Sequence, residues 1–314
     1  MTLLLSERDV QSLVEMREVV PVVEECFRQQ ASSRAFNSAR TRTEAPGSIL
    51  NVMHASLPYL GRAGAKSYLS TKKGTRFLFV LFRLEDGEPL AVMGADILGR
   101  YRTGAASAVA TKHMAHSRNF TLAVLGAGGQ ALTQVLAMAE VASLESVRVW
   151  SPTADRRESF VATLKDSGFR ATSHQSVEDA LYTSDVATAI TSAGAPFLSR
   201  SAVAGLVHLN LCGSNSPKRV EAEPDVVTAF KTIAVDDIKQ AKVEAGDLIL
   251  SEQNGFLSWE RLVELKDIVS GKVWSEGPSL FKSCGIAIED VAVASLLYDR
   301  GAKSGAGAEV ELGL

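Results

Sequence analysis

The chain has few cysteines, and their spacing suggests neither a disulfide framework nor a metal site. Cys26, Cys212 and Cys284 are odd in number and far apart, without a CxxC pair and without a histidine at metal-ligand spacing. This pattern predicts free thiols in a reducing compartment and no bound metal. We therefore expect a cytoplasmic protein.

Long apolar runs and a strong charge imbalance are also absent. No apolar run approaches the roughly 18 residues needed to span a bilayer. The Leu triplet near the N-terminus is followed at once by Glu7 and Arg8, which argues against a secretory signal. A net charge of −3 and a pI near 6.0 give no electrostatic reason to expect nucleic acid or an anionic membrane surface. A small molecule is the expected partner.

At 314 residues the chain is long for one domain, and its pattern changes near residue 118. Four short apolar segments separated by Gly, Pro and Asp turns precede this point, at 49–53, 65–70, 77–82 and 90–93. Because no helix lies between them, they predict an antiparallel sheet. Beyond it, strand and helix patterns alternate, which predicts a parallel sheet with helices on both faces. The expected fold is α/β, with a Rossmann-type doubly wound sheet and a smaller α+β domain with antiparallel strands.

Helical patterns flank the predicted strands. A capping-box pattern begins at Ser6, and residues 17–32 form an amphipathic helix. Further helices are expected over 103–116 and 289–300. The Gly- and Ala-rich residues 301–314 predict a loose tail.

The most informative segment is 120–138, in which an apolar strand, a glycine-rich turn and a helix follow one another in register. The turn has the form Gly126-x-Gly128-x-x-Ala131, the dinucleotide-binding fingerprint with Ala in the third small position. Such a turn lets a pyrophosphate approach the backbone at the positive end of the helix dipole. The alternative is a plain strand-to-helix turn. We expect NAD or NADP to be bound by Gly126, Ala127, Gly128, Gly129, Gln130 and Ala131.

The end of the next strand bears on the choice of cofactor. An acidic residue there normally binds the ribose 2′-OH of NAD. Here the strand ends in Ser151-Pro152-Thr153, and Arg156 and Arg157 follow. Hydroxyl groups and guanidinium groups in place of a carboxylate favour NADP, with Ser151, Thr153 and Arg156 as cofactor-binding residues. The alternative is that both arginines simply solvate the next helix.

Cationic side chains upstream are candidates for binding a substrate carboxylate. Lys66 lies in an apolar strand, where a buried ammonium group needs a counter-charge. Arg102, expected just before helix 103–116, can offer a bidentate fork to a carboxylate. Arg40 and Arg42 could supply a second clamp. Individually, each of these residues is also compatible with an ordinary surface charge.

Several ordered motifs resemble those of the ornithine cyclodeaminase/mu-crystallin family, over nearly the whole chain. They are Arg42-Thr43-Glu44-Ala45-Pro46, Lys66, Gly87 to Ala91, Arg102-Thr103-Gly104-Ala105, the GAGxQA loop 126–131, the segment from Asp236-Asp237 to Gly246-Asp247, and the segment from Phe281 to Asp290. The resemblance implies a nicotinamide cofactor and chemistry at the α-carbon of an amino or imino acid. It implies that Arg42, Lys66 and Arg102 hold the substrate carboxylate, and that Lys66 can also move a proton.

The resemblance further implies a homodimer formed through the antiparallel sheets. The expected domains are a substrate-binding and dimerisation domain, 1–117 plus 289–314, and an NAD(P)-binding Rossmann domain, 118–288. Ser283 and Gly285 resemble the family's loop beside the nicotinamide, and Thr191, after the predicted strand 185–190, completes the expected cofactor-binding residues. Asp236 and Asp237 end a predicted strand, so we expect them near the site, with helix capping by Asp237 as the alternative.

One motif departs from the family. Its Gly-x-Asp-x-Pro-Gly-Lys stretch is similar to residues 213–218 here, but Asn215 stands in the Asp position. An amide cannot accept a proton at pH 7 as a carboxylate does. This favours reduction of a ketimine, such as a cyclic imino acid, or an amino-acid dehydrogenase over cyclodeamination of ornithine. His54 is either a compensating base or an ordinary strand-end histidine. A non-catalytic ligand-binding protein is the rival from another class, and the retained cations argue against it.

Overall fold

The computed structural model describes residues 1–313, and the chain divides into two compact units. The first comprises residues 1–102 together with the C-terminal segment from Ile286, and the second comprises Thr103–Gly285. The domains predicted from the sequence, with a boundary between residues 117 and 118, stay a prediction. Within the described residues, no helix is long and apolar enough to cross a membrane, and no group of three acidic, His or Cys side chains could hold a metal ion.

The first unit is built on an eight-stranded sheet in the order β16-β1-β7-β6-β5-β4-β2, with β3 also paired to β4. The strands are β1 (Thr2–Leu5), β2 (Phe36–Asn37), β3 (Thr41–Ala45), β4 (Ser48–Leu57), β5 (Arg62–Thr71), β6 (Gly74–Arg83), β7 (Pro89–Gly94) and β16 (Ala308–Val310). The four predicted strands are all present and longer than expected. The sheet is mixed rather than purely antiparallel, because β1 pairs with β7 in parallel.

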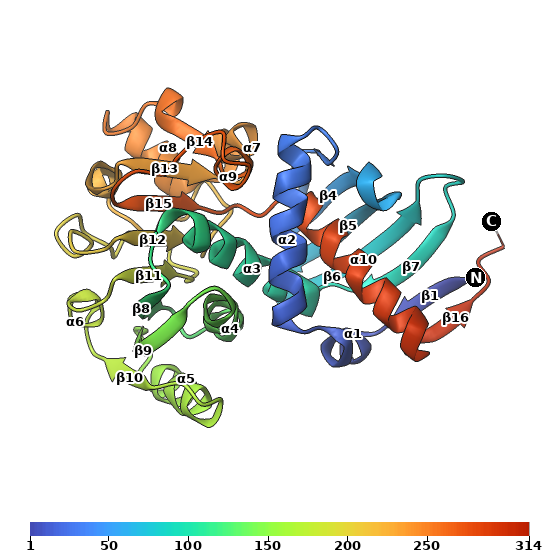
Figure 1. Cartoon of the computed structure of the whole chain (residues 1–314), viewed down its shortest axis with the longest axis horizontal. Coiled ribbons are helices and arrows are strands. Elements are labelled where there is room, and N and C mark those ends of the chain that lie inside the picture. The colour runs from blue at the N-terminus through green and yellow to red at the C-terminus, as the bar shows by residue number, and fades with distance from the viewer. Residues whose placement is uncertain (314) are drawn as a thin grey trace. The chain divides into compact units, whose positions relative to one another are not determined.

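Helices cover one face of this sheet. They are α1 (Glu7–Leu13), α2 (Met16–Ala31), the 3-10 turn η1 (Pro58–Leu60) and α10 (Ala287–Ser304). The capping box at Ser6 and Asp9 is present. In Figure 1, α2 and α10 run side by side over the strands, and α10 packs against both α2 and β4. The long C-terminal helix therefore carries residues 289 and 290 into the interior of the first unit.

Two predictions at the ends of elements are wrong. Helix α3 (Asp96–Met114) begins at Asp96 instead of residue 103, so Arg102 lies within the helix and not before it. Its start is stabilised by Glu7, whose carboxylate accepts hydrogen bonds from the N–H groups of Asp96 (2.8 Å) and Ile97 (3.1 Å). The tail is not loose either, because α10 runs to Ser304 and β16 then pairs with β1.

The second unit holds a parallel sheet in the order β10-β9-β8-β11-β12-β15-β13-β14. Its strands are β8 (Asn119–Leu125), β9 (Ser143–Trp150), β10 (Ala171–His174), β11 (Val186–Ala189), β12 (His208–Leu211), β13 (Thr232–Val235), β14 (Leu262–Glu264) and β15 (Ser279–Lys282). The strand order reverses between β8 and β11, the topological switch point where doubly wound sheets bind ligands. The predicted α/β fold with a Rossmann-type sheet is confirmed.

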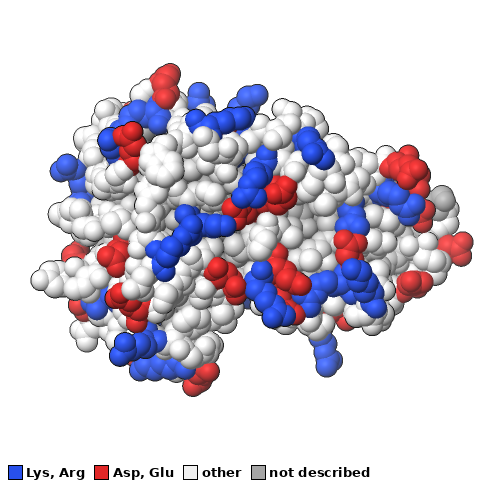
Figure 2. Space-filling view, in the orientation of Figure 1, with Lys and Arg blue, Asp and Glu red and all other residues white. Residues whose placement is uncertain are grey.

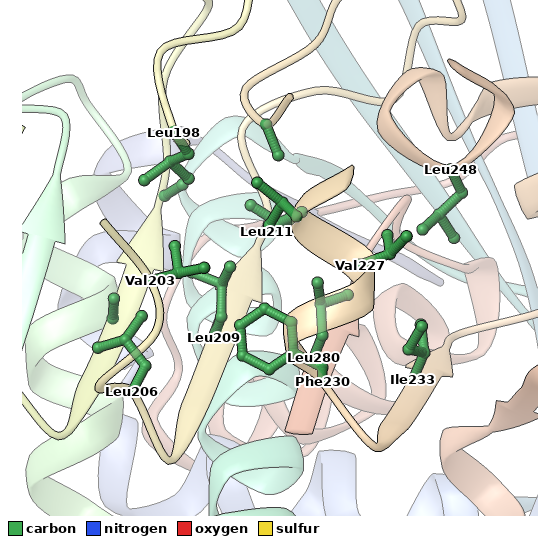
Figure 3. Packing of buried hydrophobic residues seen from close by; sticks show 14 of the residues in the cluster. Leu198, Val203, Leu206, Leu209, Leu211, Val227, Phe230, Ile233, Leu248 and Leu280 are labelled. Atoms are coloured by element: carbon green, nitrogen blue, oxygen red, sulfur yellow. The ribbon is translucent and has the colours of Figure 1, made fainter. Parts of the chain in front are cut away.

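Short helices connect these strands. They are α4 (Ala131–Val141), α5 (Ala154–Asp166), α6 (Val177–Leu181), η2 (Pro224–Ala229), α7 (Ile238–Glu244), α8 (Gly246–Gln253), η3 (Trp259–Arg261) and α9 (Leu265–Val269). Buried apolar side chains from the central strands and from η2 and α8 pack into a continuous core, part of which Figure 3 shows around Leu209, Leu280 and Phe230. This core holds the carboxyl ends of β8, β11 and β12 in place.

The molecular surface carries charges of both signs. Figure 2 shows Lys and Arg side chains interspersed with Asp and Glu on the face in view, with no extended field of one sign. This agrees with the small net charge of −3. The surface in view therefore offers no basic stripe of the kind that binds a nucleic-acid backbone.

Candidate functional site

The glycine-rich turn leaves β8 in a conformation that requires glycine. Gly126 has a φ of +121°, and a Cβ added there would lie 2.6 Å from the carbonyl oxygen of Ile190. Its N–H donates to the carbonyl oxygen of Trp150 at 2.8 Å. The turn is therefore wedged between the ends of the two neighbouring strands, β9 and β11.

Gly128 faces open space instead. A Cβ added at this position would meet no heavy atom within 4 Å. Ala131 begins α4 and is fully buried, while Gln130 is the N-cap and makes no side-chain capping bond. Gly128 thus leaves room for a pyrophosphate beside the N-terminus of α4, as the fingerprint predicts.

A pocket of about 230 Å³ opens at this turn, at the carboxyl ends of the strands. It is lined by Gly126, Ala127, Gly128, Trp150, Ser151, Pro152, Thr153, Arg156, Ile190, Thr191, Ser192, Ala193 and Phe197. The structure therefore brings together most of the residues expected to bind the cofactor. Gly129 lines an adjoining, more open pocket with Asp155 and Arg156.

Sequence reasoning missed the aromatic wall of this pocket. Trp150 and Phe197 stack with ring centroids 5.1 Å apart. Trp150 ends β9, but Phe197 lies far along the chain in the connection between β11 and β12, so no local pattern joins them. Such a wall suits the planar adenine ring of a dinucleotide.

The two arginines after β9 have different environments. Arg157 is buried and donates to the carbonyl oxygen of Ser151 and to the hydroxyl of Ser173, both at 3.0 Å. Arg157 therefore fixes the ends of β9 and β10, and the idea that it merely solvates the helix is wrong. Arg156 is exposed and lines the pocket.

Asp236 and Asp237 also differ. Asp237 is the N-cap of α7 and accepts from the N–H of Gln240 at 2.9 Å, so the capping alternative is confirmed. Asp236 is buried, and its Oδ2 accepts from the hydroxyl of Ser283 (3.1 Å) and from the N–H groups of Cys284 and Gly285 (both 2.6 Å). Asp236 thus fixes the loop that contains Ser283 and Gly285, two residues that do not line the pocket at the glycine turn.

Two cationic residues of the first unit, Lys66 and Arg102, form a buried cluster with two carboxylates. Lys66, only 2% exposed, donates from Nζ to Oδ1 of Asp290 at 2.6 Å. The guanidinium of Arg102 contacts the same oxygen from Nε at 3.1 Å and Oε2 of Glu289 from Nη1 at 2.8 Å. The counter-charge expected for Lys66 is thus supplied by the protein, from Asp290. Periodicity could not reveal this, because Glu289 and Asp290 are adjacent and both fully buried.

The environment of Lys66 shifts its titration towards neutrality. Burial, and next the charge of Arg102, lower the pKa of Lys66 to about 8, although Asp290 opposes the shift. Arg40 is buried and also lowers this pKa. A lysine with such a pKa can give up a proton near physiological pH.

The remaining candidates are Arg42 and His54 in the first unit and Asn215 in the second. Arg42 is half-buried in β3 and donates from Nε to Oδ1 of the buried Asn51, at 3.1 Å. His54 is exposed next to the buried Met53, which pairs with Lys66, so its side chain lies on the opposite face of the sheet from Lys66. Asn215 is half-buried in the loop after β12, in the second unit.

A model of the ornithine cyclodeaminase/mu-crystallin family matches residues 1–305. The chain belongs to this family. It is 33% identical over 222 residues to ketimine reductase mu-crystallin of Rattus norvegicus, covering 70% of this chain and 68% of the relative. The family assignment predicted from the motifs is confirmed.

Solved structures of similar proteins agree with this assignment. The chain superimposes with a TM-score of 0.93 on Thermococcus litoralis Δ1-pyrroline-2-carboxylate reductase in complex with NADH and L-proline (29% identity; 98% and 100% of the chains covered). It superimposes with a TM-score of 0.92 on an archaeal alanine dehydrogenase dimer with bound NAD (29% identity, 99% of both chains). The prediction of an NAD(P)-dependent imino-acid or amino-acid oxidoreductase is confirmed, whereas the roles of individual residues stay predictions.

The burial of Lys66 predicts a pH dependence of stability. Its pKa falls from 10.5 to about 8 on folding, so between these values the unfolded chain binds more protons and the free energy of unfolding rises with pH. Relative to Lys66→Met, the wild type should gain roughly 3 kcal/mol across this window and show a constant difference below it. Urea unfolding at a series of pH values measures both curves, and parallel curves would contradict the assignment.

Proposed function

We propose that the protein is an NAD(P)-dependent ketimine reductase that transfers hydride to the α-carbon of a cyclic imino acid. The archaeal alanine dehydrogenase of the same fold binds NAD, and oxidation of an amino acid would move hydride from the same carbon in the opposite direction. The observation that carries the proposal is the buried Lys66–Arg102 pair with a lysine pKa of about 8. In this pair, Arg102 is a binding group for a carboxylate and Lys66 is a proton source, and imine reduction requires both.

The chemistry divides between cofactor and protein. When bound, the nicotinamide supplies the hydride. Arg102 and Arg42 are proposed to bind the substrate carboxylate, because a guanidinium fork fixes both its oxygens. Lys66 is proposed to contact the carboxylate and to deliver a proton towards the imine nitrogen, while Asp290 orients its ammonium group before the transfer. Such positioning accounts for much of the rate advantage in hydride transfer.

Asn215 supports reduction over deamination. Reduction of C=N needs hydride at carbon and a proton at nitrogen, whereas conversion of ornithine to proline also needs ammonia loss and ring closure. A base at this position is worth about 10²- to 10⁴-fold in rate, and an amide cannot act as one. The alternative is cyclodeamination of ornithine, and the assay below distinguishes it from imine reduction. If the protein turns over neither substrate, a non-catalytic binding protein is favoured.

We further propose that the pocket accepts NADP, although NADH and NAD are bound in the two similar structures. The support is Arg156, exposed on the pocket wall, together with Ser151 and Thr153 at the end of β9. A guanidinium there can pair with a 2′-phosphate, and residues 151–153 include no carboxylate that would repel it. Asp155 lines the adjoining, more open pocket and does not line the pocket at the glycine turn.

We propose that the protein is a homodimer joined through the open face of the first sheet. Leu69 and Leu78 are 44% and 49% exposed there, and Leu50 lies directly across from Leu69 in the β4–β5 register. The helices of this unit pack on the other face. The archaeal alanine dehydrogenase of the same fold is a dimer. Exposed apolar side chains on one face of a sheet are unfavourable in water, and burying them against a second copy of the chain stabilises a dimer.

We propose the cytoplasm as the compartment. Cys26, Cys212 and Cys284 are all buried thiols outside any disulfide in residues 1–313. Burial raises the pKa of Cys212 to about 12, which keeps its thiol protonated and unreactive. Thiols of this kind suit a reducing environment.

The catalytic proposal predicts a clear substrate profile. Purified protein should oxidise NADH or NADPH with Δ1-pyrroline-2-carboxylate, and should release no ammonia from ornithine. Arg102→Met should lower kcat/KM for the imino acid at least about 100-fold by removing the carboxylate fork. Asn215→Asp should leave reduction within a few-fold and introduce slow ornithine deamination. Efficient deamination by the wild type would refute the argument from Asn215.

The cofactor proposal predicts a selective effect of one arginine. Arg156→Gln should raise KM for NADPH about tenfold, since one charge-assisted contact to the phosphate is lost, and change KM for NADH less than about twofold. Arg170→Gln, an exposed arginine away from the pocket lining, is the matched control. If Arg156→Gln changes KM for NADPH and for NADH equally, Arg156 does not bind the 2′-phosphate.

The dimer proposal predicts dissociation by a single charge. Leu69→Arg should convert the dimer to a monomer in light scattering coupled to gel filtration, because the new guanidinium would be buried against the second copy. Val243→Arg, at an exposed apolar position of the second unit, should leave the mass unchanged. A dimer that survives Leu69→Arg places the interface elsewhere.

A further inference from the structure

The second unit contains a buried ion group that the reaction above does not use. Lys282, at the end of β15, is fully buried and donates from Nζ to Oδ2 of Asp247 at 2.7 Å and to the carbonyl oxygen of Ser214 at 3.0 Å. Burial opposes the charge of Lys282, yet Asp247 raises its pKa above the ordinary value. A buried ammonium group loses its hydration, so it is stable only where contacts such as these compensate for the loss.

Glu221 is the second carboxylate of the group, and it binds the ends of two neighbouring strands. Its Oε1 accepts from both the N–H and the hydroxyl of Thr191, each at 2.8 Å. Its Oε2 accepts from the N–H of Gly213 at 2.9 Å. Thr191 follows β11 and lines the cofactor pocket, while Gly213 follows β12 and begins the loop that carries Asn215.

Asp247 connects the two halves of the group. Its Oδ1 accepts from the N–H groups of Glu221 (2.6 Å) and Ala222 (3.0 Å), while Oδ2 binds Lys282. The carboxylate of Asp247 therefore fixes the backbone from which Glu221 projects. Lys282, Asp247 and Glu221 form a continuous chain of contacts from β15 to the ends of β11 and β12.

The backbone at Gly213 packs too closely against its neighbours to leave room for a side chain. A Cβ added at Gly213 would lie 2.3 Å from Oε1 of Glu221 and 2.3 Å from the carbonyl oxygen of Thr191. A glycine is thus required where the pocket edge, the Asn215 loop and the carboxylate converge. Glu221 is therefore closely packed against the residues on either side of it.

We propose that Glu221, Asp247 and Lys282 are positioning residues that set cofactor affinity by fixing the Thr191–Ala193 edge of the pocket and the Ser214–Asn215 loop. The proposal rests on the cofactor site assigned under the proposed function. A carboxylate is required because three donors converge on its two oxygens. Burial raises the pKa of Glu221, and the charge of Lys282 opposes this shift, so the lysine favours the charged form, which has more acceptor sites.

The test compares Glu221→Gln with a destabilising control. The side-chain amide of this variant directs an NH₂ group at Thr191 or at Gly213, so one contact is lost. We expect the Kd for NADH, measured by fluorescence titration, to rise about tenfold, and KM for NADH to rise with it. At saturating NADH, kcat should stay within about threefold. Amide hydrogen exchange should accelerate in segments 190–194 and 212–216.

His208→Gln is the matched control for lost stability. His208 is buried in β12 and contacts Ser279 (2.8 Å) and Asn210 (3.2 Å), and none of these three residues lines the pocket. This substitution should lower Tm yet leave the Kd for NADH within about twofold. If Glu221→Gln lowers Tm similarly and binds NADH as tightly as the wild type, the positioning role is overturned.

A second variant covers the case in which Glu221→Gln does not fold. Thr191→Val removes the hydroxyl that donates to Glu221 (2.8 Å) and accepts from the N–H of Ala193 (3.2 Å), so it loosens the same pocket edge and should weaken NADH binding about threefold with little change in Tm. Unchanged affinity in Thr191→Val would then overturn the proposal. Wild-type protein that binds neither NADH nor NADPH would refute the cofactor site itself, and this result is distinguishable because the variants are not needed to obtain it.

Discussion

Compensation of buried charge is the constraint on which both units depend. Lys66 in the first unit and Lys282 in the second are almost fully buried, and each is held by an aspartate from a distant helix, Asp290 and Asp247 respectively. An uncompensated ammonium group in either place would cost several kcal/mol. The outcome differs, because burial lowers the pKa of Lys66 whereas Asp247 raises that of Lys282. Lys66 is left able to lose a proton, whereas the charged form of Lys282 is favoured.

The glycines mark where backbone crowding positions the site. Gly126 and Gly213 each meet a neighbouring strand end that excludes a side chain, while Gly128 faces open space. Close packing around the first two fixes the walls of the pocket, and the open position leaves room for the ligand. The same small residue therefore serves opposite purposes, decided by what lies across from it in the sheet.

Local signals predict the elements well and their ends poorly. The dinucleotide turn, the strand alternation after Phe120 and the capping box at Ser6 depend on neighbours in the sequence, and all are present. The start of α3 escapes local prediction because Glu7, which binds its first N–H groups, lies 89 residues away from Asp96. The order of the tail escapes it because the strand that β16 pairs with, β1, is at the other end of the chain.

Short-range spacing and an ordered set of motifs were enough to establish the family and the α/β fold. They also identified the glycine-rich turn and the cationic residues, whose roles stay predictions. Which charges meet is settled only in the folded chain. Folding pairs Lys66 with Asp290, places Arg157 at the strand ends and Arg156 on the pocket wall, and brings Phe197 against Trp150. The physical reason is that burial and electrostatic pairing depend on distances through space, which residues far apart in sequence acquire only when the chain has folded.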